Sequence, residues 1–246
     1  MRLNERSSKY FKKAIKDLEG YIQEDRKKLK SDEYPKKNLI FRRLYLYGRY
    51  LAEAHYCVGS TNQVVMQELR EAVNWYSQYL SYCDFHLSEI DELDLRFWIE
   101  IVSISSIIND HDALNALQKT KIDKIYDKHF YNVFELLLSM MTKNYKAVQE
   151  FIEANRKTKK AEIKSISKIC EGILSKDSKL IATSLKERQA WFERDLKKTR
   201  EINRAAPESD MYTGFWDWPV AAIVYKEGIL DNLPAAYIPI DLFHSS

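Results

Sequence analysis

Apolar side chains recur at intervals of three and four residues along most of this 246-residue chain. The clearest stripe consists of Val65, Leu69, Val73, Tyr76, Leu80, Cys83 and Leu87. Such spacing gathers apolar residues on one face of an α-helix, whereas a strand would alternate them with polar residues. Alternating stretches never exceed a few residues, and the chain holds only six glycines and five prolines. The sequence therefore predicts an all-α protein.

Short breaks between the periodic stretches divide the chain into helices of different length. The predicted helices cover residues 5–30, 35–57, 61–87, 95–108, 113–118, 130–141, 145–155, 160–174, 178–203 and 220–226. Gly59 is placed to end the second helix, and Thr61 or Ser60 to cap the third. Short connections make consecutive helices antiparallel neighbours. We expect antiparallel helical hairpins packed into a compact multi-helix array, without the fixed period of a solenoid.

The polar connection at residues 120–127 is the best candidate for a domain boundary. It would separate an N-terminal helical region, residues 1–119, from a C-terminal helical region, residues 120–246. The connection has no flexible Gly/Ser composition, so one continuous fold is the alternative.

Charge and composition exclude several classes of protein. The net charge of +3 is too small to indicate nucleic-acid binding, and the basic doublets are scattered along the chain. No apolar run approaches the roughly 18 residues that a membrane span requires. Met1 opens a charged segment that does not resemble a signal peptide, so we expect a cytoplasmic protein without membrane contact. The three cysteines are odd in number and far apart, which argues against a disulfide framework.

Motifs for catalysis are missing from the sequence. His55 with Cys57, and the run 110–112, are the only local clusters of metal-ligand types, and neither has zinc-site spacing. There is no Gly-x-Ser-x-Gly elbow and no glycine-rich phosphate loop. We therefore expect no enzyme activity, no metal and no cofactor. A helical hydrolase whose carboxylates bind a metal remains an alternative.

The segment 211–242 differs from the rest of the chain because it concentrates aromatic residues, glycines and prolines. Asp217 before Trp218 and Pro219 predicts a helix entrance, with the Asp carboxylate as the cap. Gly228 is placed to end that helix, and later prolines force an extended path. Rings this dense favour packing into a core edge over ligand contact.

A family resemblance is carried by this segment. The order Tyr212-x-Gly214-Phe215-Trp216-x-Trp218-x-x-Ala221-Ala222, then Gly228-Ile229-x-Asp231, then Tyr237-x-Pro239-x-Asp241-Leu242 resembles the C-terminal signature of PoNi-type immunity proteins. That family is named for guarding bacteria against polymorphic nuclease effectors. The signature covers about the last eighth of the chain, and the N-terminal helices resemble the family only loosely. At Pro219 the sequence departs from the acidic residue, typically Glu, expected there, so any role of that carboxylate does not carry over.

The resemblance implies an immunity protein that neutralises a cognate nuclease toxin, a DNase by first expectation, in interbacterial competition. Such an inhibitor would block the toxin's active site or DNA groove. It also implies that seven signature residues hold the C-terminal fold together: Tyr212, Gly214, Trp216, Trp218, Tyr237, Pro239 and Asp241. The alternative is a helical scaffold or adaptor that binds a peptide or protein partner. Nothing in the sequence indicates the oligomeric state.

An acidic segment suggests where such an inhibitor would act. Residues 84–112 carry eight acidic residues and one basic residue, between flanks with a positive excess. A DNA-binding nuclease presents a basic groove, which carboxylates can occupy in place of phosphates. The candidate toxin-binding residues are Asp84, Glu89, Asp91, Glu92, Asp94, Asp110 and Asp112, with Tyr82 and Phe85 as aromatic anchors. The alternative is a set of ordinary helix-end carboxylates. Reversing Asp91, Glu92 and Asp94 to Lys is expected to leave the fold intact and weaken toxin binding.

Overall fold

A computed structural model describes residues 8–31, 34, 36–204, 216–229, 238–239 and 242, with backbone alone for residues 196–204. About 79% of the described residues are helical, and this part of the chain contains ten helices and one two-stranded sheet. The predicted all-α fold is confirmed.

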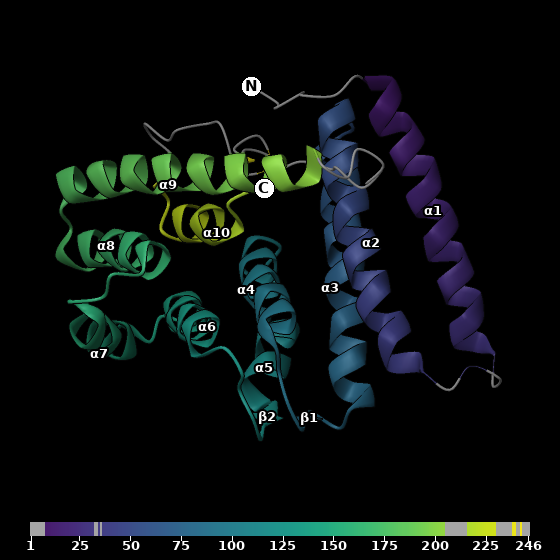
Figure 1. Cartoon of the computed structure of the whole chain (residues 1–246), viewed down its shortest axis with the longest axis horizontal. Helices are drawn as coiled ribbons and strands as arrows, with labels where there is room; N and C mark the ends of the chain where they lie inside the picture. Colours follow the sequence, from purple (N-terminus) through teal and green to yellow (C-terminus); the bar gives the residue numbers. More distant parts are fainter. Residues whose placement is uncertain are drawn as a thin grey trace.

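The N-terminal region forms three long helices that lie side by side (Figure 1): α1 (Ser8–Lys30), α2 (Lys37–Val58) and α3 (Asn62–Tyr82). Gly59 ends α2 in the left-handed conformation with φ 87°. Thr61 then caps α3 by accepting a hydrogen bond from the Val64 amide. A side chain at Gly48 would bring its Cβ within 3.0 Å of the Ala72 Cβ, so glycine there permits the close approach of α2 and α3.

The stripe predicted to continue to residue 87 ends earlier. Asp84 and Phe85 take left-handed backbone conformations, with φ of 52° and 54°, and this turn stops α3 at Tyr82. Leu87 is therefore not helical. It lies in β1 (His86–Leu87), which pairs in parallel with β2 (Lys121–Ile122). A further bridge joins Ile90 to Ile125. The connection predicted at residues 120–127 is thus hydrogen-bonded to residues 85–90.

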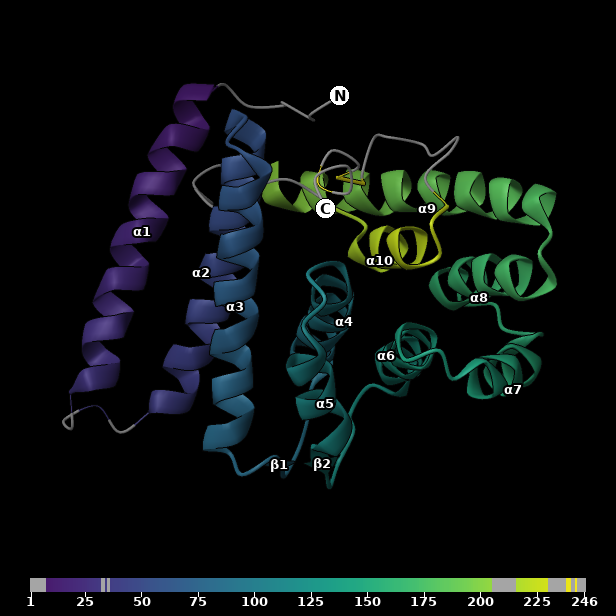
Figure 2. The same ribbon diagram turned by 180° about the vertical axis from the view of Figure 1, so that it is seen from behind.

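Between the two strands run α4 (Glu92–Ile107) and α5 (His111–Lys119). The chain continues through α6 (Lys128–Met141), α7 (Tyr145–Asn155), α8 (Ala161–Ser175), α9 (Ser178–Arg204) and α10 (Trp218–Lys226). Seen from behind, α1–α3 lie on one side of α4, and α6–α8 lie on the other (Figure 2). The helix α9 runs crosswise to α1–α3, with α10 beside it.

The core is centred on α4, which is apolar nearly all round. Trp98 is almost fully buried, and its ring lies 4.9 Å from that of Phe134 on α6. Its Nε1 also donates a hydrogen bond of 2.8 Å to the Tyr76 hydroxyl on α3. Buried residues on both sides of residue 119 belong to one hydrophobic cluster, which therefore continues across the predicted domain boundary. Within the described residues, no helix has the length and apolar character to cross a membrane.

Candidate protein-binding surface

The predicted acidic residues lie at the two ends of α4. Residues 84–94 precede this helix or form its first turn, whereas Asp110 and Asp112 follow its last turn. A helix of 16 residues is about 24 Å long at 1.5 Å per residue. The structure therefore divides the predicted surface into two separate clusters.

The first cluster lies on what we call the ladder end, formed by residues 82–93 together with residues 119–127. Leu87 and Ile90 are buried beneath it, while polar side chains on its outer side bond across the two strands. Tyr126 donates a hydrogen bond of 2.8 Å from its hydroxyl to the Glu89 carboxylate. The Lys124 ammonium in turn donates to the Tyr126 hydroxyl, also at 2.8 Å. These bonds join the side chains of the two segments across the outer side of the ladder.

A cross-strand pair adds to these bonds. His86 Nε2 lies 2.9 Å from the Asp123 Oδ1, and both side chains are exposed. Exposed pairs of this kind contribute little to stability, about 0–1 kcal/mol. They can exchange partners at small cost when another protein approaches.

Not every predicted carboxylate of this cluster is available to a partner. Asp91 caps α4 by accepting a 2.9 Å hydrogen bond from the Asp94 amide, and Glu92 pairs with exposed Arg96. Asp94 itself is buried, and its Oδ1 lies 2.5 Å from Arg42 Nη2 on α2. Burial raises the pKa of the Asp94 carboxyl above its usual range, although Arg42 opposes this. Asp94 thus joins two helices and is not part of the exposed surface.

The two predicted aromatic anchors differ in their exposure. Tyr82 is 53% exposed, but Phe85 is only partly exposed, and the Lys119 ammonium lies 3.4 Å from its ring centroid. Leu93 is 52% exposed and Tyr126 is 56% exposed, and neither was among the predicted surface residues. Leu93 stands between two acidic residues, a signal that was present in the sequence. Tyr126 joins this surface only through strand pairing between distant segments, which no local pattern reveals.

The second cluster borders an open polar cleft of about 790 Å³ between α3 and the α4–α5 turn. Asp110 caps α5 by accepting a 3.0 Å hydrogen bond from the Ala113 amide, and Asp112 is exposed in the first turn. The opposite wall comes from four residues of α3: Gln67, Arg70, Glu71 and Asn74. Acidic and basic groups are mixed here, and Ile108 is the one apolar residue of the lining.

In the segment that carries the resemblance, Trp218, Ala221 and Ala222 are buried, Trp216 is partly buried and Gly228 is exposed. Trp216 and Trp218 are stacked at 5.1 Å, and Trp216 meets Tyr56 of α2 edge-on at 4.5 Å. The Trp218 Nε1 donates a hydrogen bond of 3.3 Å to the Glu53 carboxylate. Pro239 is also buried. Tyr212, Gly214, Tyr237 and Asp241 lie outside the described residues.

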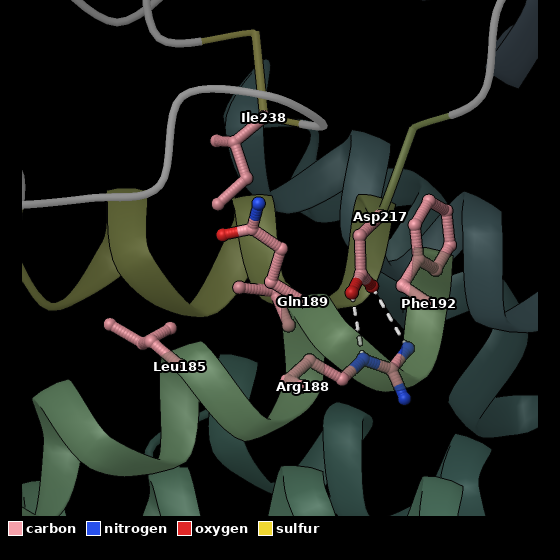
Figure 3. A pocket seen from close by; sticks show the side chains of 7 residues that line it. Leu185, Arg188, Gln189, Phe192, Asp217 and Ile238 are labelled. Atoms are coloured by element: carbon pink, nitrogen blue, oxygen red, sulfur yellow. Dashed lines mark hydrogen bonds and ion pairs between the residues drawn. The ribbon is translucent and has the colours of Figure 1, made fainter. Parts of the chain in front are cut away.

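Asp217 was predicted to cap α10, but its side chain makes no capping hydrogen bond. It accepts two hydrogen bonds from Arg188 of α9, at 2.7 Å from Nε and 2.9 Å from Nη2 (Figure 3). Both side chains are buried. A buried guanidinium without a carboxylate would be strongly destabilising, so this pairing takes precedence over the cap. The adjoining cavity of about 20 Å³ has room for a single water at most.

A second buried network joins α2 to α4. Arg49 Nη1 lies 2.6 Å from the Glu53 carboxylate, and its Nε lies 3.1 Å from that of Glu100. The Tyr45 hydroxyl donates a 3.0 Å hydrogen bond to Glu100. Burial raises the pKa of the Glu100 carboxyl, against the opposing effect of Arg49. The i, i+4 spacing of Arg49 and Glu53 within an apolar stretch was the sequence signal for this network.

The described residues hold free thiols and no cluster of metal ligands. In the described part of the chain, no group of three or more His, Cys, Asp or Glu side chains is arranged to hold a metal ion. Cys57, Cys83 and Cys170 are free thiols, and burial raises the pKa of Cys170 to about 12.

Comparison of the chain with protein-family models, curated proteins and solved structures finds no match.

Proposed function

We propose that this chain is a cytoplasmic immunity protein that binds and neutralises a nuclease toxin of an interbacterial competition system. In this proposal it acts as an antitoxin without catalysis, metal or cofactor, and it contacts neither nucleic acid nor membrane. It covers the active site or DNA groove of the toxin, a DNase by first expectation. The C-terminal signature described above supports the assignment to this class of inhibitor.

The observation that carries the proposal is the composition of the ladder end. Three of the five exposed large apolar side chains in the described residues lie there, namely Tyr82, Leu93 and Tyr126. Exposed apolar groups that gather on one surface are typical of binding sites, and tyrosine is enriched among residues that dominate binding energy. Exposed carboxylates of Asp84, Glu89 and Glu92 lie on the same end.

Electrostatics make this surface suitable for a nuclease. A DNA groove is lined with cations that otherwise neutralise phosphates, so carboxylates can take the place of the phosphates. Opposite charges also accelerate encounter, and a toxin must be stopped before it cuts. Because the strand pairing and the cap of α4 already fix this surface, binding requires little ordering of the backbone.

The direct test is co-expression with the nuclease encoded by the neighbouring gene. We expect the two proteins to purify as a stable complex, and DNA cleavage to stop near one equivalent of inhibitor. The matched control is an inhibitor with Lys146→Glu on α7, an exposed charge reversal away from the ladder end. Absence of a complex would refute the proposal. A complex that still cleaves DNA would instead favour the scaffold or adaptor alternative.

A further inference from the structure

The ladder end carries three lysines beside its acidic residues, which the charge count along the sequence did not show; Asp123, paired with His86, lies between two of them. Lys119, Lys121 and Lys124 belong to the β2 side, and all three side chains are exposed. In the strand register, Lys121 lies directly opposite His86. His86 follows Asp84 by two residues. Neighbouring strands lie about 4.8 Å apart, so the lysines adjoin the acidic residues.

The three lysines differ in how they are engaged. Lys119 covers the Phe85 ring, and Lys124 donates to the Tyr126 hydroxyl. The Lys121 ammonium makes no hydrogen bond or ion pair with any other residue that the structure describes, and its backbone amide fixes its position by donating to the Phe85 carbonyl at 2.8 Å. The backbone of Lys121 is therefore fixed by the ladder, and its ammonium is free to meet a partner.

A metal-dependent nuclease presents the inverse of this pattern. Its Mg²⁺ is held by carboxylates, and the walls around them are basic because they grip phosphates. A purely acidic inhibitor would bind the basic groups of the walls, but the metal-binding carboxylates would repel it. A surface with acidic residues and an adjoining lysine matches both.

We propose that Lys121, together with Lys124 from the same segment, binds the metal-coordinating carboxylates of the toxin, while Asp84 and Glu89 meet its phosphate-binding cations. This inference rests on the proposed function, and it names the partner groups at the same surface. An ammonium is a compact charge with three donors, suited to carboxylates that otherwise surround a metal ion. Inhibitor and Mg²⁺ then compete, and by linkage each weakens the binding of the other.

The test measures the dissociation constant of the complex with the neighbouring-gene nuclease, in EDTA and in saturating Mg²⁺. We expect Mg²⁺ to weaken binding by about tenfold or more. Lys121→Met keeps the length of the side chain and removes its charge. This variant should bind about tenfold more weakly in EDTA and should lose most of the Mg²⁺ dependence. Lys124→Met should show the same pattern to a smaller degree.

The control is Lys146→Met on α7, which should retain both the affinity and the Mg²⁺ effect. Equal affinity with and without Mg²⁺ would overturn this inference and leave the proposed function standing. A Lys121→Met variant that weakens binding equally in both buffers would place Lys121 away from the carboxylates, and would also overturn it. No binding in either buffer would refute the proposed function itself.

Discussion

Two regions of this molecule combine carboxylates, cations and aromatic rings, but in opposite environments. Around α10, the pair of Arg188 and Asp217 and the network of Arg49, Glu53 and Glu100 join helices inside the protein. At the ladder end, Glu89, Tyr126 and Lys124 form a similar chain of hydrogen bonds that faces outward. The same residue types therefore serve two purposes, and burial decides which one.

The energetic difference between the two regions should be large. Removing one partner from a buried ion pair leaves an uncompensated charge and costs about 3–5 kcal/mol, whereas an exposed pair contributes about 0–1 kcal/mol. Groups around α10 are thus committed to the fold. Side chains at the ladder end can be replaced with little loss of folding free energy, and they remain available for binding.

The largest expected effect is on the buried pair. Arg188→Ala should lower the free energy of unfolding by about 3–5 kcal/mol, because Asp217 stays buried without its partner. Lys168→Ala is the matched control, since Lys168 of α8 pairs at 2.7 Å with Glu187, the neighbour of Arg188 on α9, but in a more exposed setting. That variant should lose less than about 1 kcal/mol. If urea denaturation gave equal losses of unfolding free energy for the two variants, the distinction between buried and exposed pairs would be contradicted.

A smaller loss is expected from removing one buried donor. Trp218→Phe keeps most of the ring and deletes the Nε1 hydrogen bond to Glu53, which should cost about 1–3 kcal/mol. Tyr126→Phe deletes the exposed hydroxyl that bonds Glu89, and should change stability by about 0.5 kcal/mol or less. Thermal unfolding of both variants provides the measurement. A larger loss of stability for Tyr126→Phe than for Trp218→Phe would contradict the view that the buried groups stabilise the fold and the exposed groups do not.

The buried network also predicts a pH dependence. Because burial raises the folded-state pKa of Glu100 above its unfolded value, the folded state binds the proton more readily. This residue therefore favours unfolding at neutral pH, and protonation relieves the penalty as the pH falls through the raised pKa. Relative to Glu100→Gln, the wild-type protein should gain stability on acidification from neutral pH towards the ordinary range of glutamate. Parallel pH profiles of the two proteins would argue against a raised pKa.

The smallest effect on stability is expected at the ladder end. The exposed carboxylates suited to charge reversal are those of Asp84, Glu89 and Glu92, because Asp94 is buried and Asp91 caps α4. Each reversal to Lys should change the free energy of unfolding by about 0.5 kcal/mol or less. Losses of several kcal/mol in urea denaturation would mean that these carboxylates belong to the structural framework.

Much of the fold follows from local spacing, as several particular elements show. The helix over residues 145–155 was predicted at both ends, and Gly59 and Thr61 act at the termini where they were expected. These features depend on side chains within one or two turns of each other. Local chemistry is therefore sufficient to predict them.

The candidate surface was less predictable because it depends on distant contacts. Whether Asp94 faces water or Arg42 is set by the packing of α4 on α2, some fifty residues away in sequence. Lys121 and Lys124 lie outside the acidic segment in the sequence, so a charge count along the chain does not group them with it. In the structure, the parallel strand pairing places these lysines next to the acidic segment. Asp217 does precede α10 as predicted, but the role of its side chain was misassigned for the same reason, since its partner Arg188 lies on another helix.

The most direct measurement is the affinity of the toxin for the combined variant Asp84→Lys, Glu89→Lys and Glu92→Lys, compared with the Lys146→Glu control. We predict that the ladder-end variant stays folded and binds at least about 100-fold more weakly, with most of the loss in the association rate at low salt. The control should bind like the wild-type protein. Unchanged affinity for the ladder-end variant would contradict the claim that this surface binds the toxin.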